Sequence, residues 1–429
     1  MASKSNLSVV IDLGTSKIAA LAGKKTEEGK IEILGMAQVP SKGIKRGLVF
    51  NVDDVATAVT RVVNEIENQV GEEVRSVNIS YAGQHLKTLS YRGYRYTSED
   101  GIVTRFDLNE LYNEAKNLKI EQDYKIVHVI PQSYVVDGEI SELNPVGITG
   151  RKLEANYKLV VVPEAQLVNI QRVFDKAGLQ VGEIILSPLA ISEAVLTDDE
   201  KEVGAIVLDM GAGTTKFAIY HDNVLVHTAV VPFGGNVVTN DIKEGCSILV
   251  KWAEQLKIKY GQALGDFADE QKVVTIPGYN GWEPKEISFK SLAFIIQARL
   301  EEIIDSVYAQ MEKSGIEQQV GTGIVLAGGA SNMNNMISLV KFRTGMDARK
   351  AFSVIHPANK RKELQGQEYL TALGLLKLSA ENTPVFQEKE KVKKVKEKPK
   401  REGNGSAWKK VFQGVLDYID DDNDDLAMN

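Results

Sequence analysis

Residues 9–20 read VVIDLGTSKIAA, and residues 206–219 read IVLDMGAGTTKFAI. Each stretch is an apolar strand that ends in an aspartate, followed by a turn rich in Gly, Thr and Ser and by a second apolar strand. Aligning the two stretches pairs Lys17 with Lys216 and needs two extra residues in the second turn. A motif that recurs after about 200 residues indicates two similar halves. The sequence therefore predicts a duplicated α/β fold.

The two turns have the composition of a phosphate site. Glycine permits a tight turn and close approach of a ligand, and the exposed backbone N–H groups and hydroxyls bind anions. Asp12 and Asp209 would repel phosphate, so we assign them to Mg²⁺, held through water. For one such turn alone, a plain hairpin is the alternative. Recurrence of the turn in register favours two facing phosphate-binding turns.

The first 380 residues alternate short apolar runs with amphipathic helices, as α/β proteins do. Around the first motif we expect strands over residues 7–13, 18–23, 31–39 and 77–83. A long helix should begin after Asn51, which is a good N-cap residue. Residues 84–162 interrupt this order with polar strand-like pieces and one helix near residues 108–118, so we expect an inserted subdomain there.

Further glycine-rich passages lie in the second half. Residues 323–333, GIVLAGGASNM, follow a strand pattern and should open a helix, with Gly328 and Gly329 allowing a base or sugar to lie against the backbone. Residues 234–242, GGNVVTNDI, should begin another helix. On the helix after it, Glu254 and Lys257 have the spacing of an exposed i,i+3 ion pair.

These motifs carry a family resemblance. Residues 12–17, 208–215 and 326–330 resemble the phosphate-one, phosphate-two and adenosine motifs of the actin/Hsp70/sugar-kinase superfamily. Within that superfamily, the chain resembles the FtsA family of bacterial cell-division proteins over residues 7–378. The segments that carry this closer resemblance are 130–134 (IPQSY), 144–147 (NPVG), 234–242 and 254–261 (EQLKIKYG).

The resemblance implies an actin-like duplicated fold, in which two RNase H-like halves surround a nucleotide cleft and an α+β subdomain 1C replaces actin subdomain 1B. The implied domains are 1–83 with 163–200 (subdomain 1A), 84–162 (1C), 201–378 (2A and 2B), 379–406 (charged linker), 407–420 (amphipathic helix) and 421–429 (acidic end). The motifs and the resemblance together assign the binding of ATP with Mg²⁺ to Asp12, Gly14, Thr15, Ser16, Lys17, Asp209, Gly211, Gly213, Thr214, Thr215, Lys216, Gly234, Gly235, Asn236, Glu254, Lys257, Gly328, Gly329 and Ala330.

One departure from the superfamily concerns hydrolysis. Where related proteins carry a Glu or Gln that orients the attacking water, this chain has Ser187. Serine is too short for that task, and Glu193, two turns further on, is expected at the surface. We therefore expect weak or no ATPase activity, and we assign no catalytic residue.

The C-terminal segment differs in composition from the rest. Residues 388–401 hold eight Lys or Arg and three Glu, which is typical of a flexible linker. After this segment, apolar residues from Trp408 to Ile419 recur at helical spacing and would form one apolar stripe on a helix. No further core-forming segment follows on which this stripe could pack. A core helix that folds back, a helix for a partner's groove and an interfacial membrane helix are the alternatives, and the resemblance favours the last. The implied membrane residues are Trp408, Lys409, Lys410, Val411, Phe412, Val415, Leu416 and Ile419.

Composition limits the remaining classes. The net charge of −7 argues against nucleic-acid binding. The sequence contains no run of eighteen apolar residues, so it predicts no membrane span. The first residues lack the apolar core of a signal peptide. The single cysteine, Cys246, excludes an internal disulfide and should be an inert packed residue. We therefore expect a cytosolic protein.

The resemblance implies a peripheral protein on the cytoplasmic face of the bacterial cell membrane, at the division site. It would form filaments with itself, bind the tubulin-like protein FtsZ, and recruit later division proteins. Arg299, on a helix expected over residues 293–311, is a candidate contact for the acidic C-terminal peptide of FtsZ. A pilus-assembly or shape-determining actin homologue and a small-molecule kinase are the alternatives.

Overall fold

The computed structural model describes residues 7–382 except 142, 279–280, 282, 316–319, 360, 362–363 and 365. These residues belong to one compact unit, Met1–Thr383. The expected linker from residue 383 onward, the expected amphipathic helix over residues 407–420 and the acidic end lie outside the described part. No helix within that part is long and apolar enough to cross a membrane.

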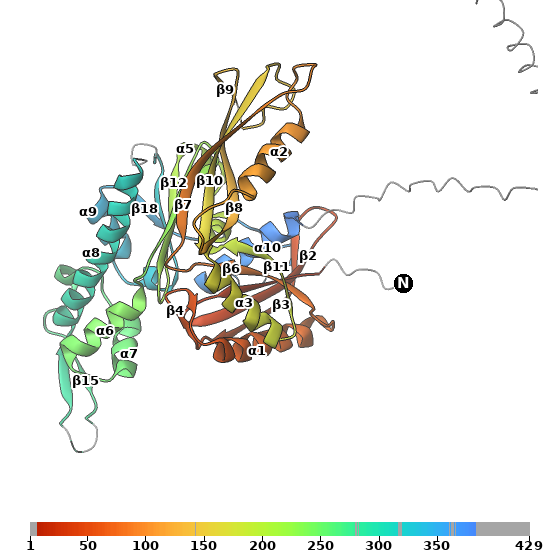
Figure 1. Ribbon diagram of the computed structural model, residues 1–429. Helices are drawn as coiled ribbons and strands as arrows, with labels where there is room; N and C mark the ends of the chain where they lie inside the picture. Colours follow the sequence, from red (N-terminus) through yellow and green to blue (C-terminus); the bar gives the residue numbers. More distant parts are fainter. Residues whose placement is uncertain are drawn as a thin grey trace, which may run out of the picture. The chain divides into compact units, whose positions relative to one another are not determined.

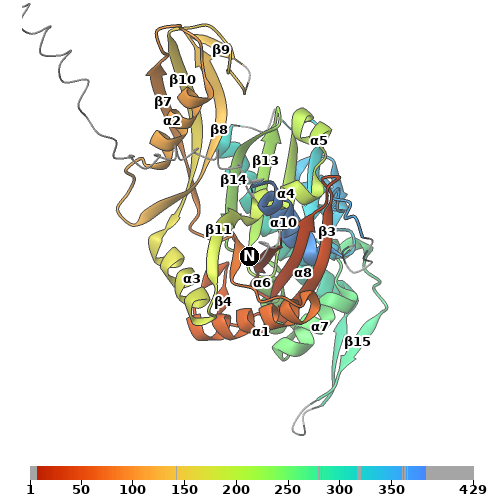
Figure 2. The ribbon, with the colours of Figure 1, turned by 90° about the vertical axis from the view of Figure 1, so that its right-hand side faces the viewer.

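Two five-stranded sheets share one topology (Figures 1 and 2). The first has the order β3-β2-β1-β6-β11, formed by β1 (Ser8–Leu13), β2 (Lys17–Lys25), β3 (Ile31–Pro40), β6 (Ser76–Tyr81) and β11 (Gln180–Leu186). The second has the order β14-β13-β12-β17-β18, formed by β12 (Ala205–Met210), β13 (Thr215–His221), β14 (Val224–Val231), β17 (Gly323–Ala327) and β18 (Ala348–Lys350). In each sheet an antiparallel meander of three strands is followed by two parallel strands. The duplication expected from the two motifs is confirmed.

The register of the two hairpins corrects the alignment of their turns. Leu13 pairs with Ile18 in the first hairpin, and Met210 pairs with Thr215 in the second. Four residues therefore separate the last paired residues in each hairpin, 14–17 in the first and 211–214 in the second, and the expected insertion of two residues is wrong. Lys17 is the first residue of β2 and pairs with Pro40 of β3, whereas Lys216 lies on β13 directly opposite Asp209. The two lysines look equivalent by residue type, but backbone pairing decides which positions correspond.

Helices cover the outer faces of both sheets. α1 (Val52–Val70) begins at the expected N-cap, because the Asn51 side chain accepts hydrogen bonds from the backbone N–H groups of Asp53 and Asp54. It packs on β2, β3 and α3 (Glu164–Lys176) through a buried Val and Ile stripe. The second sheet is covered by α6 (Gly235–Cys246), α7 (Val250–Tyr260), α8 (Phe289–Ser314) and α9 (Met336–Thr344). Cys246 is buried, which raises the pKa of its thiol, as expected of a packed cysteine.

The helix expected directly after Gly328 is not present. The chain forms only a 3₁₀ turn there, Gly329–Asn332, and α9 begins at Met336. Gly328, with φ of 82°, precedes the turn, and Asn335, a left-handed residue with φ of 61°, separates the turn from α9. The shorter elements are β4 (Ile44–Lys45), β5 (Leu48–Val49), α5 (Asp198–Val203), β15 (Val273–Ile276) and β16 (Lys285–Ser288).

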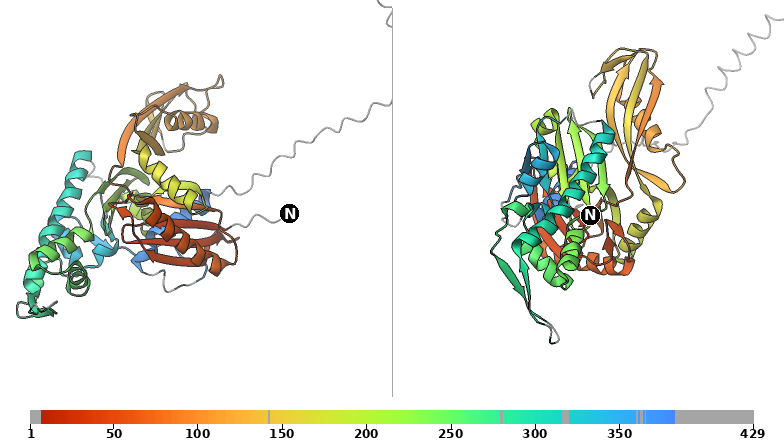
Figure 3. Two further views of the ribbon diagram at one scale, coloured as in Figure 1. Left: turned by 60° about the horizontal axis from the view of Figure 1, so that its bottom comes forward. Right: turned by 90° about the vertical axis from the view of Figure 1, so that its left-hand side faces the viewer.

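An inserted α+β segment forms its own antiparallel sheet (Figures 2 and 3). Its sheet has the order β7-β10-β8-β9, formed by β7 (Lys87–Tyr96), β8 (Tyr124–Val136), β9 (Glu139–Ser141) and β10 (Lys152–Pro163), and it packs on α2 (Arg105–Lys116). At its base the segment also contacts β14 of the second sheet. Gln132 Nε2 donates to Leu225 O at 3.1 Å, and Thr88 Oγ1 donates to Thr228 O at 3.2 Å.

The last helix of each half packs on the other half. α4 (Ser187–Val195) follows the first sheet but packs on the second, and α10 (Leu370–Asn382) follows the second sheet but packs on the first. The two helices cross at Gly374, where a Cβ would lie 1.7 Å from Ala190 O. α10 continues to Asn382, past the residue 379 at which the sequence indicated a linker, because Ser379 is still buried against the body of the protein.

Glu193 is not the surface residue that we expected. Its side chain is 15% exposed, and it pairs with Lys201 Nζ at 2.5 Å and with Lys377 Nζ at 2.9 Å. Burial alone would raise the pKa of Glu193, but the two ammonium groups outweigh burial and lower it. Glu193 therefore links α4, α5 and α10 electrostatically.

His128 gives the fold a pH dependence. Burial lowers the pKa of this half-buried ring on β8 from 6.5 to about 4, while Nε2 accepts a hydrogen bond from Leu186 N at 3.2 Å. Between pH 6.5 and 4 the His128 ring binds a proton in the unfolded chain but not in the folded chain. Its contribution to the free energy of unfolding is therefore fully present above pH 6.5 and is lost on acidification towards pH 4. We expect the free energy of unfolding to drop by at most ~3 kcal/mol from this residue.

Denaturant unfolding at several pH values tests this expectation. His128→Gln keeps an acceptor for Leu186 N but does not titrate, so its stability should change less between pH 6.5 and 4 than that of the parent protein. The exposed His85 provides the matched control, and His85→Gln should leave the pH slope unchanged. A His128→Gln protein with the parent's slope would contradict the assignment.

Candidate functional site

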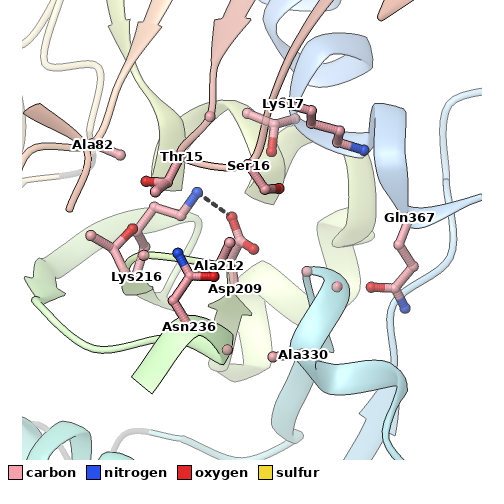
Figure 4. A pocket seen from close by; sticks show the side chains of 18 of the residues that line it. Thr15, Ser16, Lys17, Ala82, Asp209, Ala212, Lys216, Asn236, Ala330 and Gln367 are labelled. Atoms are coloured by element: carbon pink, nitrogen blue, oxygen red, sulfur yellow. Dashed lines mark ion pairs between the residues drawn. The ribbon is translucent and has the colours of Figure 1, made fainter. Parts of the chain in front are cut away.

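A cavity of about 330 Å³ lies between the two halves (Figure 4). It is lined by both Gly/Thr/Ser turns, by the start of α6, by one side of α7 and by the 3₁₀ turn after β17. All the residues assigned to ATP from the sequence line it, except Thr215 and Gly234. Thr215 is buried and donates from Oγ1 to Phe233 O, and Gly234 is the N-cap residue of α6.

The two turns approach each other closely across the cavity. A Cβ on Gly213 would lie 2.6 Å from Thr15 Oγ1, and a Cβ on Gly14 would lie 2.5 Å from Lys17 O. Glycine is therefore required at both positions, once for the contact between the halves and once for the turn itself. Backbone N–H groups and the hydroxyls of Thr15, Ser16 and Thr214 line one end of the cavity, which gives that end the donors that a phosphate chain needs.

The two aspartates expected to hold Mg²⁺ lie at the ends of β1 and β12 and have different partners. Asp12 Oδ1 accepts a hydrogen bond from Ser80 Oγ at 2.5 Å. Asp209 Oδ2 pairs with Lys216 Nζ at 2.5 Å, and the same Nζ donates to Ser187 Oγ at 3.0 Å. Figure 4 shows the Lys216–Asp209 ion pair within the cavity. Carboxylate oxygens beside a phosphate-type turn fit a hydrated Mg²⁺, but at Asp209 the metal would meet an ammonium group.

The two lysines of this region differ electrostatically. Burial lowers the pKa of Lys17, although nearby carboxylates, led by Glu368, oppose the change. Burial would also lower the pKa of Lys216, but the charges of Asp209 and Asp12 outweigh it and raise this pKa. Lys216 is therefore a permanently charged, enclosed cation.

At the other end of the cavity, Glu254 and Lys257 of α7 form a more enclosed pair than the exposed one that their spacing predicted. The Lys257 side chain is only 10% exposed, and its Nζ donates to Glu254 Oε2 at 2.7 Å. It also donates to Gly235 O at 3.0 Å and to Thr239 Oγ1 at 2.8 Å. These bonds fix the start of α6 against α7, and they place both side chains beside the Gly328–Ala330 turn that the sequence assigned to the nucleoside.

Several lining residues were missed by the sequence analysis. They are Leu13, Gly47, Ala82, Ala212, Ile258, Asn332, Gln367, Glu368 and Thr371. Gln367 Oε1 accepts a hydrogen bond from Ser331 Oγ at 3.3 Å, which attaches the segment before α10 to the 3₁₀ turn. This segment reaches the cavity only because α10 crosses to the other half, and nothing in its local sequence indicates that.

Arg299 lies on α8, outside the residues that line the cavity. It is not a free surface cation, because its guanidinium pairs with Asp241 of α6 and with Glu302. The other predicted contact surface, Trp408 to Ile419, lies outside the described residues.

Comparisons with known proteins identify the family. The family model "Cell division protein FtsA" matches residues 206–374, and the model "SHS2 domain inserted in FTSA" matches residues 83–161. The FtsA protein of Neisseria meningitidis serogroup B is 34% identical over 375 residues, 86% of this chain and 88% of its own. The FtsA protein of Escherichia coli strain K12 is 30% identical over 385 residues, 88% of this chain and 91% of its own.

Solved structures agree on the fold. A type IV pilus biogenesis complex, PilM–PilN, matches with a TM-score of 0.62 at 15% identity, over 87% of this chain and 98% of that one. MreB5 of Spiroplasma citri, solved with ADP, matches with a TM-score of 0.51 at 13% identity, over 89% and 100%. At such identities these likenesses show the fold alone, and they confirm the actin-like α/β architecture. The inserted SHS2 domain is shown by the family model over residues 83–161. By its sequence, the chain belongs to the FtsA family of cell-division proteins.

Proposed function

We propose that this chain binds ATP with Mg²⁺ in the cavity between its halves and assembles into actin-like filaments. These filaments would anchor the tubulin-like FtsZ ring to the cytoplasmic face of the bacterial membrane at the division site. The observation that carries the nucleotide part is the convergence of two equivalent Asp-x-Gly turns on one cavity. Membership of the FtsA family supports the role in division.

Each part of the cavity has chemistry for one part of the nucleotide. The turn residues Thr15, Ser16 and Thr214 would donate to the phosphates. Glu254 and Lys257 would lie near the adenine, and the Gly328–Ala330 turn would lie against the sugar or base. Asp12 and Asp209 would hold the metal through water. A bound Mg²⁺ would neutralise and orient the phosphate chain. MreB5, which shares the fold, was solved with ADP, in agreement with this assignment.

Hydrolysis would be slow. Ser187 lies at the start of α4, is 1% exposed, and accepts a hydrogen bond from Lys216 Nζ. A short, buried hydroxyl that is already engaged by an ammonium group is poorly suited to activating water. Glu193, the other candidate on α4, is held by two lysines and so does not replace the expected Glu or Gln.

The partner surfaces belong to the proposal as well. The Trp408–Ile419 stripe would bind the membrane, and the inserted domain would contact later division proteins or the next protomer. A contact between Arg299 and an acidic FtsZ peptide would have to replace one of the two carboxylates that already pair with this arginine. Asp241 and Glu302 would therefore tune such a contact.

A lipid monolayer experiment tests the proposed function. Purified full-length protein with ATP and Mg²⁺ should form filaments on an anionic monolayer and recruit added FtsZ, as scored by electron microscopy. Phosphate release from the same protein should stay below about one per second, the low end of ordinary enzyme rates. Absence of filaments and of FtsZ recruitment would refute the adaptor role, and faster turnover would refute the role given to Ser187.

A further inference from the structure

Lys216 is placed in the phosphate end of the cavity by the register of one hairpin. Because Asp209 and Lys216 are directly paired across β12 and β13, their side chains emerge on the same face of the sheet. The Lys216 side chain is 12% exposed and that of Asp209 is 6% exposed. Lys216 Nζ contacts Asp209 Oδ2 at 2.5 Å and Ser187 Oγ at 3.0 Å, so it is held in place before any ligand arrives.

This position gives Lys216 a specific electrostatic task. Asp12 and Asp209 bring two negative charges to the end of the cavity where the phosphates would lie, and both carboxylates act on the Lys216 charge. Without a cation, these carboxylates would repel a phosphate chain strongly, because charges in an enclosed site are weakly screened. Lys17 also lies among carboxylates, led by Glu368, but among the described residues its ammonium group forms no ion pair, whereas Lys216 Nζ contacts Asp209 directly.

We propose that Lys216 is a built-in cation of the phosphate site, which neutralises Asp209 and contacts the terminal phosphates, so that this chain retains ATP with little dependence on Mg²⁺. The inference rests on the proposed nucleotide function and specifies how its phosphate end works. It makes Lys216 a binding residue, with Ser187 holding its ammonium group, and it leaves Asp12 as the main carboxylate for a hydrated metal.

Titration of the full-length protein with a fluorescent ATP analogue, in excess Mg²⁺ and in EDTA, tests the inference. The unaltered protein should lose less than tenfold in affinity in EDTA. Lys216→Met removes the charge at similar length, so it should lose roughly 10- to 100-fold more than the parent in EDTA, the range expected for one charge-assisted contact. Lys251→Met, an exposed lysine of α7 outside the cavity, is the matched control and should behave as the parent.

A second variant separates charge from fold. Asp209→Asn combined with Lys216→Met removes both charges, so binding in EDTA should recover relative to Lys216→Met alone. Thermal unfolding checks that each variant is folded, and the comparison of the parent with and without EDTA needs no variant. Collapse of the parent's affinity in EDTA, or equal EDTA sensitivity of the parent and Lys216→Met, would overturn the role of Lys216. Absence of ATP binding by the parent in Mg²⁺ would overturn the nucleotide function itself.

Discussion

Gly374→Ala should lower the free energy of unfolding by about 3 kcal/mol or more, although alanine is the better helix former. The added Cβ would lie 1.7 Å from the backbone oxygen of Ala190, and a backbone atom cannot rotate away. α4 and α10 would have to separate, and each of these helices packs on the half of the molecule opposite to the one that it follows. The change would therefore weaken both cores at once, which thermal or denaturant unfolding would measure.

Gly245→Ala is the matched control. Gly245 also lies inside a helix, α6, but a Cβ there would meet only the end of the Ile295 side chain, at 2.8 Å from Cδ1. That flexible side chain can move, so a change of less than about 1 kcal/mol is expected, offset by the gain in helix propensity. Equal stability of the Gly374→Ala and parent proteins would mean that the two helices do not require contact at this crossing.

Deleting residues 406–429 should abolish sedimentation with anionic liposomes while leaving ATP binding intact. The stripe begins at Trp408 and continues at i+3, i+4, i+7, i+8 and i+11, which is one face of a helix. Burying six large apolar side chains would contribute on the order of 9 to 15 kcal/mol. Ordering a dozen residues costs about 1 to 2 kcal/mol each, so a single helix would bind weakly and reversibly.

Filament formation would strengthen this weak contact. Once one helix of a filament is bound, the next helices bind intramolecularly at a high effective concentration. We therefore expect ATP conditions that favour filaments to increase sedimentation of the full-length protein. The six aspartates among residues 417–425 would be repelled by anionic lipid and would limit the affinity.

Two double variants make the tail experiment specific. Trp408→Glu with Phe412→Glu places two charges on the stripe and should reproduce the deletion. Asn404→Glu with Gln413→Glu adds the same charge off the stripe and should retain sedimentation. Undiminished sedimentation of the truncated protein would show that another surface binds the membrane, and equal loss in both double variants would indicate an effect of net charge alone.

Local pattern was enough to determine much of this protein. The two Asp-x-Gly turns, the N-cap at Asn51 and the apolar runs of the strands depend on neighbouring residues, so the sequence predicted the duplicated fold, the inserted segment and most of the cavity lining. The motif order was also enough to indicate the FtsA family, which the relatives confirm.

Only the tertiary structure decided which residues correspond and which are enclosed. The pairing of Asp209 with Lys216 depends on hairpin register, and residue type had matched Lys216 with Lys17 instead. Glu193 is buried because α4 packs on the opposite half, and Glu368 reaches the cavity because α10 does the same. Such contacts join residues that are far apart in the chain, so no periodicity or motif in the local sequence indicates them. The proposed phosphate site is thus predictable from its turns, and the cation proposed for it only from the packed fold.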